Sequence, residues 1–177
     1  NSELLNSDGD PADVARYFVE EEKDSLHMRK IRWYVDNITI ARGFTSMQKM
    51  QLIFDFVQDR ESFERVEECS TTGRLRSAEE ILYSKKATAM DRAMLAATIY
   101  STMNYKVNIL QTRDGRVALE VAEKENVCKD LCGALRNDVF SYNDDVYYVC
   151  DMQENNFVIG TIPSFKKSDF VRRIVIA

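Results

Sequence analysis

The segment 88–103 constrains the fold most, because it combines a helix start with a row of very small side chains. Thr88 is followed three residues later by Asp91, which is the spacing of a capping box, so a helix is expected to begin at Ala89. Small side chains on one face let a helix lie very close to a sheet or to another helix, and here they are Ala93, Ala96 and Ala97. We therefore predict that this segment is the central buried helix.

Helix signals also precede this segment. Asp10 and Pro11 supply an N-cap and a first-turn proline for a helix that runs to about Lys23. The stretch 26–40 is compatible with either a helix or a strand, and we interpret its Trp33, the single tryptophan, as a core residue. The expected core-facing side of the first helix consists of Val14, Tyr17 and Phe18.

Two further helices are expected between residues 45 and 83. Thr45 or Ser46 can cap the first of them, and Ser77 with Glu80 forms a capping box for a short helix through about Tyr83. Helical spacing of the apolar residues in the first one predicts a stripe that faces the core, formed by Met47, Met50, Ile53, Phe54 and Val57.

After Asn104 the apolar period changes from 3.6 to 2, which indicates strands. Asp114-Gly115 is a strong two-residue hairpin signal. Helices first and strands later predict an α+β fold, with a mostly antiparallel sheet on which the central helix packs. The expected strands are 107–110, 117–122, 139–142 and 146–152, the last two joined at Asn143-Asp144, with edge or closing strands at 157–159 and 171–176.

Length and charge limit the possible functions. A chain of 177 residues fits one domain, 1–177, with a real core. The net charge of −5 argues against nonspecific binding to nucleic acid, and no apolar run approaches the ~18 residues of a membrane span. The basic residues near the end are interpreted as a solvated face: Lys166, Lys167, Arg172 and Arg173.

The cysteines do not predict a metal site. Cys128 and Cys132 have a loose metal-like spacing, but His27 is the only histidine that could complete a ligand set. A Cys128–Cys132 bridge and plain buried thiols both remain open, and so does the compartment. We expect no metal and no cofactor, and the oligomeric state stays open.

This order of elements, together with specific residues, resembles the transglutaminase-like domain of the papain-like cysteine-protease superfamily. The resemblance covers about residues 47–160, and the family pattern at the nucleophile helix is roughly Asp-Cys-x-Asp-x-Ala-x-Leu. The stretches that carry it are 54–59 before the active-site region, 77–86 as lead-in, 88–95 as nucleophile helix, 115–121 as the histidine strand and 147–151 as the aspartate strand.

The resemblance implies that the catalytic triad positions are Ala89, Arg116 and Asp151, of which only Asp151 keeps its type. An alanine offers no nucleophile, and an arginine stays protonated and cannot act as a general base. An engineered change could explain Ala89 but not Arg116. Arg116 could pair with Asp151 where the histidine and aspartate would sit, or it could be a solvated turn residue.

The expected function is therefore that of a pseudoenzyme. A catalytically inactive transglutaminase-like domain can still hold a protein or peptide, or serve as a scaffold within a longer protein. The alternative is an active hydrolase or transamidating enzyme with a non-standard residue set. Cys150 is a poor substitute nucleophile, because neighbouring side chains of a strand point to opposite faces and Asp151 would occupy the cleft.

Overall fold

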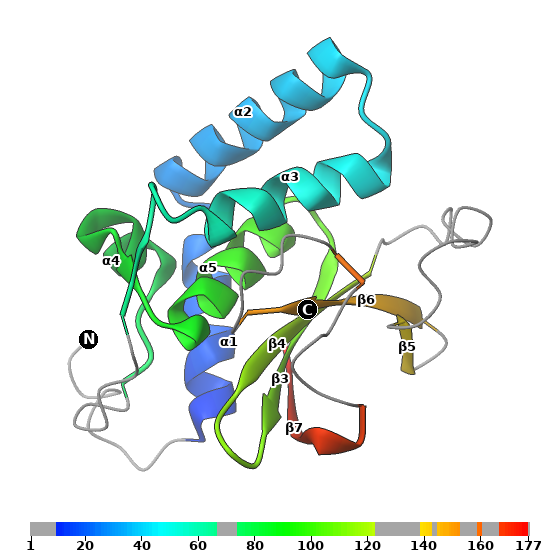
Figure 1. The fold of residues 1–177 in the computed structure, drawn as a ribbon. Coiled ribbons are helices and arrows are strands. Elements are labelled where there is room, and N and C mark those ends of the chain that lie inside the picture. The colour runs from blue at the N-terminus through cyan, green and yellow to red at the C-terminus, as the bar shows by residue number, and fades with distance from the viewer. Residues whose placement is uncertain are drawn as a thin grey trace.

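The computed structural model describes residues 10–66, 74–122, 139–142, 145–152, 159–160 and 167–176. Their architecture is α+β, with the helices first and the large sheet last (Figure 1). The helices are α1 (Pro11–Glu22), α2 (Leu26–Arg42), α3 (Ser46–Gln58), α4 (Ala78–Ser84) and α5 (Ala89–Thr102). The strands are β1 (Glu64–Arg65), β2 (Lys86–Ala87), β3 (Lys106–Thr112), β4 (Val117–Ala122), β5 (Val139–Tyr142), β6 (Asp145–Asp151) and β7 (Phe170–Val175), with a 3-10 turn η3 (Lys167–Asp169) before β7.

The large sheet has the strand order β5-β6-β4-β3-β7, and each neighbouring pair is antiparallel. Its register aligns Ile109 of β3 with Leu119 of β4, and Leu119 with Cys150 of β6. β1 and β2 form a separate parallel pair just before α5. The predicted α+β class and the antiparallel sheet are thus confirmed.

The main core lies between α5 and one face of this sheet. Every residue of α5 except Met90 is buried, which confirms the prediction of a central helix. Ile109, Leu119 and Cys150 belong to the same apolar cluster as the α5 alanines. Because side chains alternate along a strand, their neighbours face the other way, and there Leu110, Ala118 and Val149 form a second, smaller cluster.

The helix caps follow the sequence signals closely. The side chain of Asp10 accepts from the Ala12 amide at the start of α1, and Thr45 rather than Ser46 caps α3. The capping boxes predicted for α4 and α5 are both present. In each box, the cap side chain accepts a hydrogen bond from an amide of the first turn. Such amides have no acceptor within the helix.

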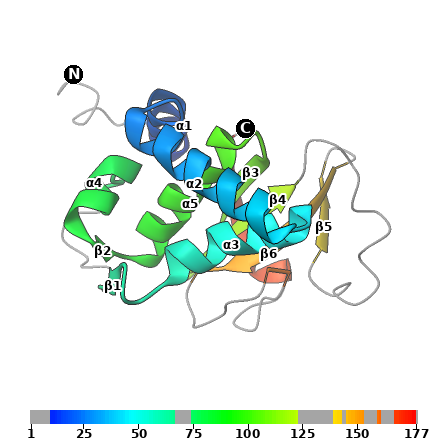
Figure 2. The same cartoon turned by 90° about the horizontal axis from the view of Figure 1, so that it is seen from above.

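Two expectations about the N-terminal helices are wrong. α1 buries Ala12, Ala15 and Val19, and the expected Phe18 packs partly buried against the core. Tyr17 is instead 42% exposed, because the small residues let α1 approach α5 and α4 closely. The stretch 26–40 is helical and forms most of α2 (Figure 2). Its Trp33 is 61% exposed rather than a core residue, because α2 turns Met28 and Val35 inward.

The strand predictions hold with small shifts of boundary. The β3–β4 hairpin turns at Asp114-Gly115, where Gly115 has φ +85°, a conformation that L side chains rarely adopt. Ile159 lies in a turn rather than in a strand, while residues 157–158, the turn at 143–144 and Cys69, Cys128 and Cys132 fall outside the described residues. None of the described helices is both long and apolar enough to cross a membrane.

A buried ion pair ties the edge strand β7 to β4 across β3. Glu120 is fully buried in β4, and both its carboxylate oxygens accept from the Arg173 guanidinium of β7, at 2.8 and 2.7 Å. Asn108 of β3 lies between them and donates to Glu120 Oε2 at 3.1 Å. Such a fork-to-carboxylate pair fixes the orientation of both groups.

We expect Arg173→Met to lower the free energy of unfolding by about 3 kcal/mol, because it leaves the Glu120 carboxylate buried without its cation. The double variant Glu120→Met, Arg173→Met should recover most of that loss, since no charge is then buried. Urea unfolding followed by circular dichroism measures both. An Arg173→Met variant with unchanged stability would show that the pair is not formed in the folded protein.

Candidate functional site

The predicted site residues lie at a junction of three chain segments, which we call the α5 junction. It comprises the start of α5 at Ala89, the end of β6 at Asp151 and Met152, and the start of β4 at Arg116 and Val117. The Met152 backbone links them: its carbonyl accepts from Nη2 of Arg92 on α5 at 2.6 Å, and its amide donates to the Val117 carbonyl at 3.2 Å. These bonds join the segments that contain Ala89, Asp151 and Arg116 through the neighbouring residues Arg92, Met152 and Val117.

The α5 N-terminus is closed by its own capping box. The Asp91 amide donates to Thr88 Oγ1 at 3.1 Å, and Asp91 Oδ2 accepts from the Thr88 amide at 2.9 Å. Arg76 completes this arrangement with two bonds to the Asp91 carboxylate, 2.6 Å from Nη2 to Oδ2 and 3.1 Å from Nε to Oδ1. The same guanidinium donates to Ser84 Oγ and to the Lys86 carbonyl, so α4, β2 and α5 are joined at one point.

Two opposing effects act on the Asp91 carboxyl. Burial by itself would raise its pKa, because a charge loses hydration inside the protein. The bonds from Arg76 and from the Thr88 amide outweigh burial and hold the pKa of Asp91 below its usual value. Asp91 is therefore an ionised structural anchor rather than a proton donor at neutral pH.

Arg92 is the most deeply buried cation of the junction. Its side chain is on the first turns of α5, the residue is only 4% exposed, and its Nη1 donates to the Ala87 carbonyl at 3.1 Å. Burial, together with the nearby charge of Arg65, lowers the pKa of Arg92 to about 10. Arg92 remains charged at pH 7 and cannot serve as a general base.

Gln58 connects the end of α3 to the same junction. Its Nε2 donates to the Asp151 carbonyl at 2.9 Å, and its Oε1 lies 3.5 Å from Nη2 of Arg65. Sequence reasoning missed Gln58, Arg65, Arg76 and Arg92 as members of the site. The available signal was a polar residue within a buried stripe, as with Gln58 directly after Val57 and Arg92 directly before Ala93.

The side chains of Ala89 and Asp151 belong to different environments. Ala89 is part of the main core cluster, on the helix side of the sheet. Asp151 is fully buried and pairs in register with Ala118, so strand alternation assigns it to the opposite face, that of the smaller cluster. Cys150 faces α5, and burial raises the pKa of its thiol. A buried, protonated thiol is a poor nucleophile.

Arg116 lies directly after the β3–β4 turn. Its Nε is 3.0 Å from Asp114 Oδ2, and nearly half of its side chain is exposed. The backbone around it is fixed by Thr112, whose Oγ1 accepts from the Arg116 amide at 2.9 Å and whose amide donates to the Arg116 carbonyl. These contacts favour the interpretation of Arg116 as a turn residue over that of a partner for Asp151.

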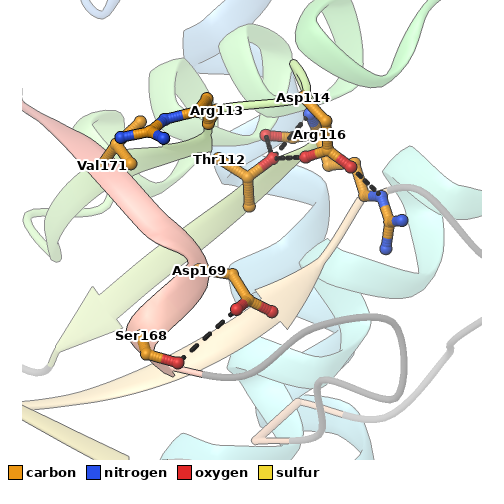
Figure 3. A pocket seen from close by; sticks show the side chains of 7 residues that line it. All are labelled: Thr112, Arg113, Asp114, Arg116, Ser168, Asp169 and Val171. Atoms are coloured by element: carbon orange, nitrogen blue, oxygen red, sulfur yellow. Dashed lines mark hydrogen bonds and ion pairs between the residues drawn. The ribbon is translucent and has the colours of Figure 1, made fainter.

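A hollow of about 560 Å³ lies beside this turn (Figure 3). The hairpin and the region around η3 line it with two arginines and two aspartates, so its charges are balanced. Asp114, Arg116 and Thr112 bond to one another there, and Ser168 Oγ is 3.5 Å from Asp169 Oδ1. The lining residues are Thr112, Arg113, Asp114, Arg116, Ser168, Asp169 and Val171.

The only histidine of the chain lies elsewhere in the fold. His27 is at the start of α2, where its Nδ1 is 2.9 Å from Oε1 of Glu79 on α4 in an exposed pair. The hydrogen bond from His27 lowers the pKa of Glu79. Within the described ranges no three His, Cys, Asp or Glu side chains are grouped as metal ligands.

Comparisons with protein-family models, with curated proteins and with solved structures found no match.

We expect Arg76→Met to lower the free energy of unfolding by about 3 kcal/mol, because the buried Asp91 carboxylate then loses its cation. Arg74→Met is the matched control: Arg74 pairs with Glu80 at the surface, so its loss should cost less than about 1 kcal/mol. Urea unfolding of both variants and the wild type gives the comparison. Equal losses in the two variants would contradict the anchoring role of Arg76.

The same pair should make stability depend on pH. Because the pKa of Asp91 is lowered in the folded state, its contribution is present above the ordinary value of 3.8 and is lost as the pH falls through the lowered value. The difference in unfolding free energy between wild type and Arg76→Met should therefore be largest near neutral pH and shrink as the pH falls, because without Arg76 burial raises the pKa of Asp91 and the variant's carboxyl is protonated first. A difference that does not change with pH would assign the effect to packing alone.

Proposed function

We propose that this chain is a catalytically inactive domain with a transglutaminase-like core, and that it binds a protein or peptide. The observation that carries the proposal is the residue at the start of the central helix. A helix N-terminus stabilises a thiolate there, but the position holds the Ala89 methyl group. Covalent acyl transfer needs a nucleophile and a base in contact, and Ala89 provides no lone pair.

The charged groups of the α5 junction support a structural role for the region. Asp91 is held ionised by Arg76, and Arg92 is committed to the carbonyls of Ala87 and Met152. These groups hold β2, α5 and β6 together and stay charged at neutral pH. A junction built in this way keeps a rigid frame for a binding surface, and neither Asp91 nor Arg92 acts in it as an acid or base at neutral pH.

The resemblance to the family remains a prediction. The register of β4 with β6 limits which of the triad positions could lie together. The backbone segments of Ala89, Arg116 and Asp151 meet at the α5 junction, but Asp151 shares the sheet face of Ala118, away from α5. Arg116 contacts Asp114 instead. The proposal therefore rests on the missing nucleophile rather than on a degenerate triad with preserved geometry.

The test is binding without turnover. We expect the wild type to release no ammonia from a glutamine peptide, to join no fluorescent primary amine to it, and to hydrolyse no peptide amide above the buffer rate. Peptides that bind should be recovered intact by mass spectrometry. A wild-type rate that disappears in Asp151→Asn would overturn the proposal and favour an enzyme with a non-standard residue set.

A matched variant reports on the helix start itself. In Ala89→Cys, the α5 N-terminus should lower the pKa of the introduced thiol below the ordinary ~8.5, so iodoacetamide should alkylate it faster at pH 7 than it alkylates Cys150. Peptide mass spectrometry separates the two sites. Slower alkylation at position 89 than at Cys150 would show that this position is not a latent nucleophile site.

A further inference from the structure

α2 lies at the top of the helical layer (Figure 1), and several of its large apolar side chains are exposed. Trp33 and Tyr34 are each 61% exposed, and their rings contact each other edge to face with centroids 5.0 Å apart. Large apolar residues rarely gather in the open on one helix face unless something binds there. We call this surface the outer face of α2, and its apolar members are Leu26, Trp33, Tyr34, Ile38 and Ile40.

The spacing on this face suits a partner helix. Leu26, Trp33 and Ile40 are each seven residues apart, which is two helical turns, so they form a straight row about 21 Å long. Lys30 and Asn37 stand between them at the 4-3 spacing of a heptad seam.

The charges around the row are positive in a chain whose net charge is −5. α2 carries four arginines and lysines and a single acid, Asp36, whose carboxylate is already taken by Lys49 at 2.6 Å. The exposed Arg29 and Lys30, four and three residues before Trp33 on the same side of the helix, have no carboxylate partner among the described residues. An acidic partner would supply those counter-charges, so the surface favours a negatively charged ligand.

We propose that the outer face of α2 binds an acidic amphipathic helix of another protein, whose apolar side covers Trp33 and whose carboxylates meet Arg29 and Lys30. The inference rests on the proposed binding function and names its surface and partner chemistry. A second copy of this chain is disfavoured, because each α2 would bring its own excess of cations. A long polyanion or an anionic membrane would extend beyond α2 and meet the exposed acids Glu20, Glu21 and Asp24 just before it.

A display library of random 16-residue peptides tests the proposal on the full chain. Selection on immobilised wild type follows depletion on a Trp33→Ala, Ile40→Ala variant, whose exposed positions allow it to fold. We expect the enriched peptides to be acidic, with apolar residues at i, i+3 or i+4, and i+7. Binding of the synthesised consensus peptide should shift the emission of Trp33, the only tryptophan, to shorter wavelength.

Matched variants locate the contact. Trp33→Ala and Lys30→Glu should each weaken binding of the labelled consensus peptide, measured by anisotropy, by about tenfold or more. Tyr83→Ala and Arg113→Glu change a still more exposed aromatic and an exposed cation outside α2, and should leave the affinity unchanged. A peptide with its glutamates replaced by lysines should lose binding as well.

Several results would overturn the proposal. Basic or aperiodic enriched peptides, or no enrichment at all, would contradict the chemistry assigned to the partner. Peptides that bind Trp33→Ala as tightly as wild type would move the site away from α2 and leave the proposed binding function intact. Self-association, vesicle binding or binding to poly(U) that is lost in Trp33→Ala would assign the surface to another occupant. Amide turnover by the wild type would remove the proposed function without affecting the α2 contact.

Discussion

The structure depends on the close approach of α5 to β3 and β4. Ala93, Ala96 and Ala97 allow it, because larger side chains would hold the helix away from the sheet and leave the strand residues Ile109 and Leu119 without contact. Once α5 is this close, its first turn reaches the end of β6, and Arg92 can bond the Met152 carbonyl. The helices α1, α2, α3 and α4 then cover what remains of α5.

Much of this fold could be predicted from local signals. The caps at Asp10, Thr45, Ser77 and Thr88 depend only on nearby backbone geometry, and the hairpin at Asp114-Gly115 depends on a glycine that accepts positive φ. Local signals did not predict which side chains of α1 and α2 are buried. Large residues such as Trp33 were expected in the core. Burial depends instead on what each helix packs against, and small side chains are buried where helices approach closely.

The sequence indicated three chain segments for a candidate site, at Ala89, Arg116 and Asp151. The backbone of Met152 joins these segments, but the side chains that form the hydrogen bonds there were not predicted. The hydrogen bonds of the Arg76 and Arg92 guanidinium groups could not be predicted, because their partners are backbone carbonyls and a carboxylate that come close only on folding. The register that turns Asp151 toward the face of Ala118 is likewise set by the whole sheet.

The Glu120–Arg173 pair has a consequence for the order of folding. β3 and β4 form a local hairpin early, whereas β7 joins β3 from more than fifty residues away in the chain and therefore arrives late. Until it arrives, Glu120 is a bare carboxylate one strand in from an open edge. Pairing with a strand of another molecule would bury that charge at a cost in free energy. Glu120 therefore stabilises the complete sheet and disfavours aggregation of the incomplete one.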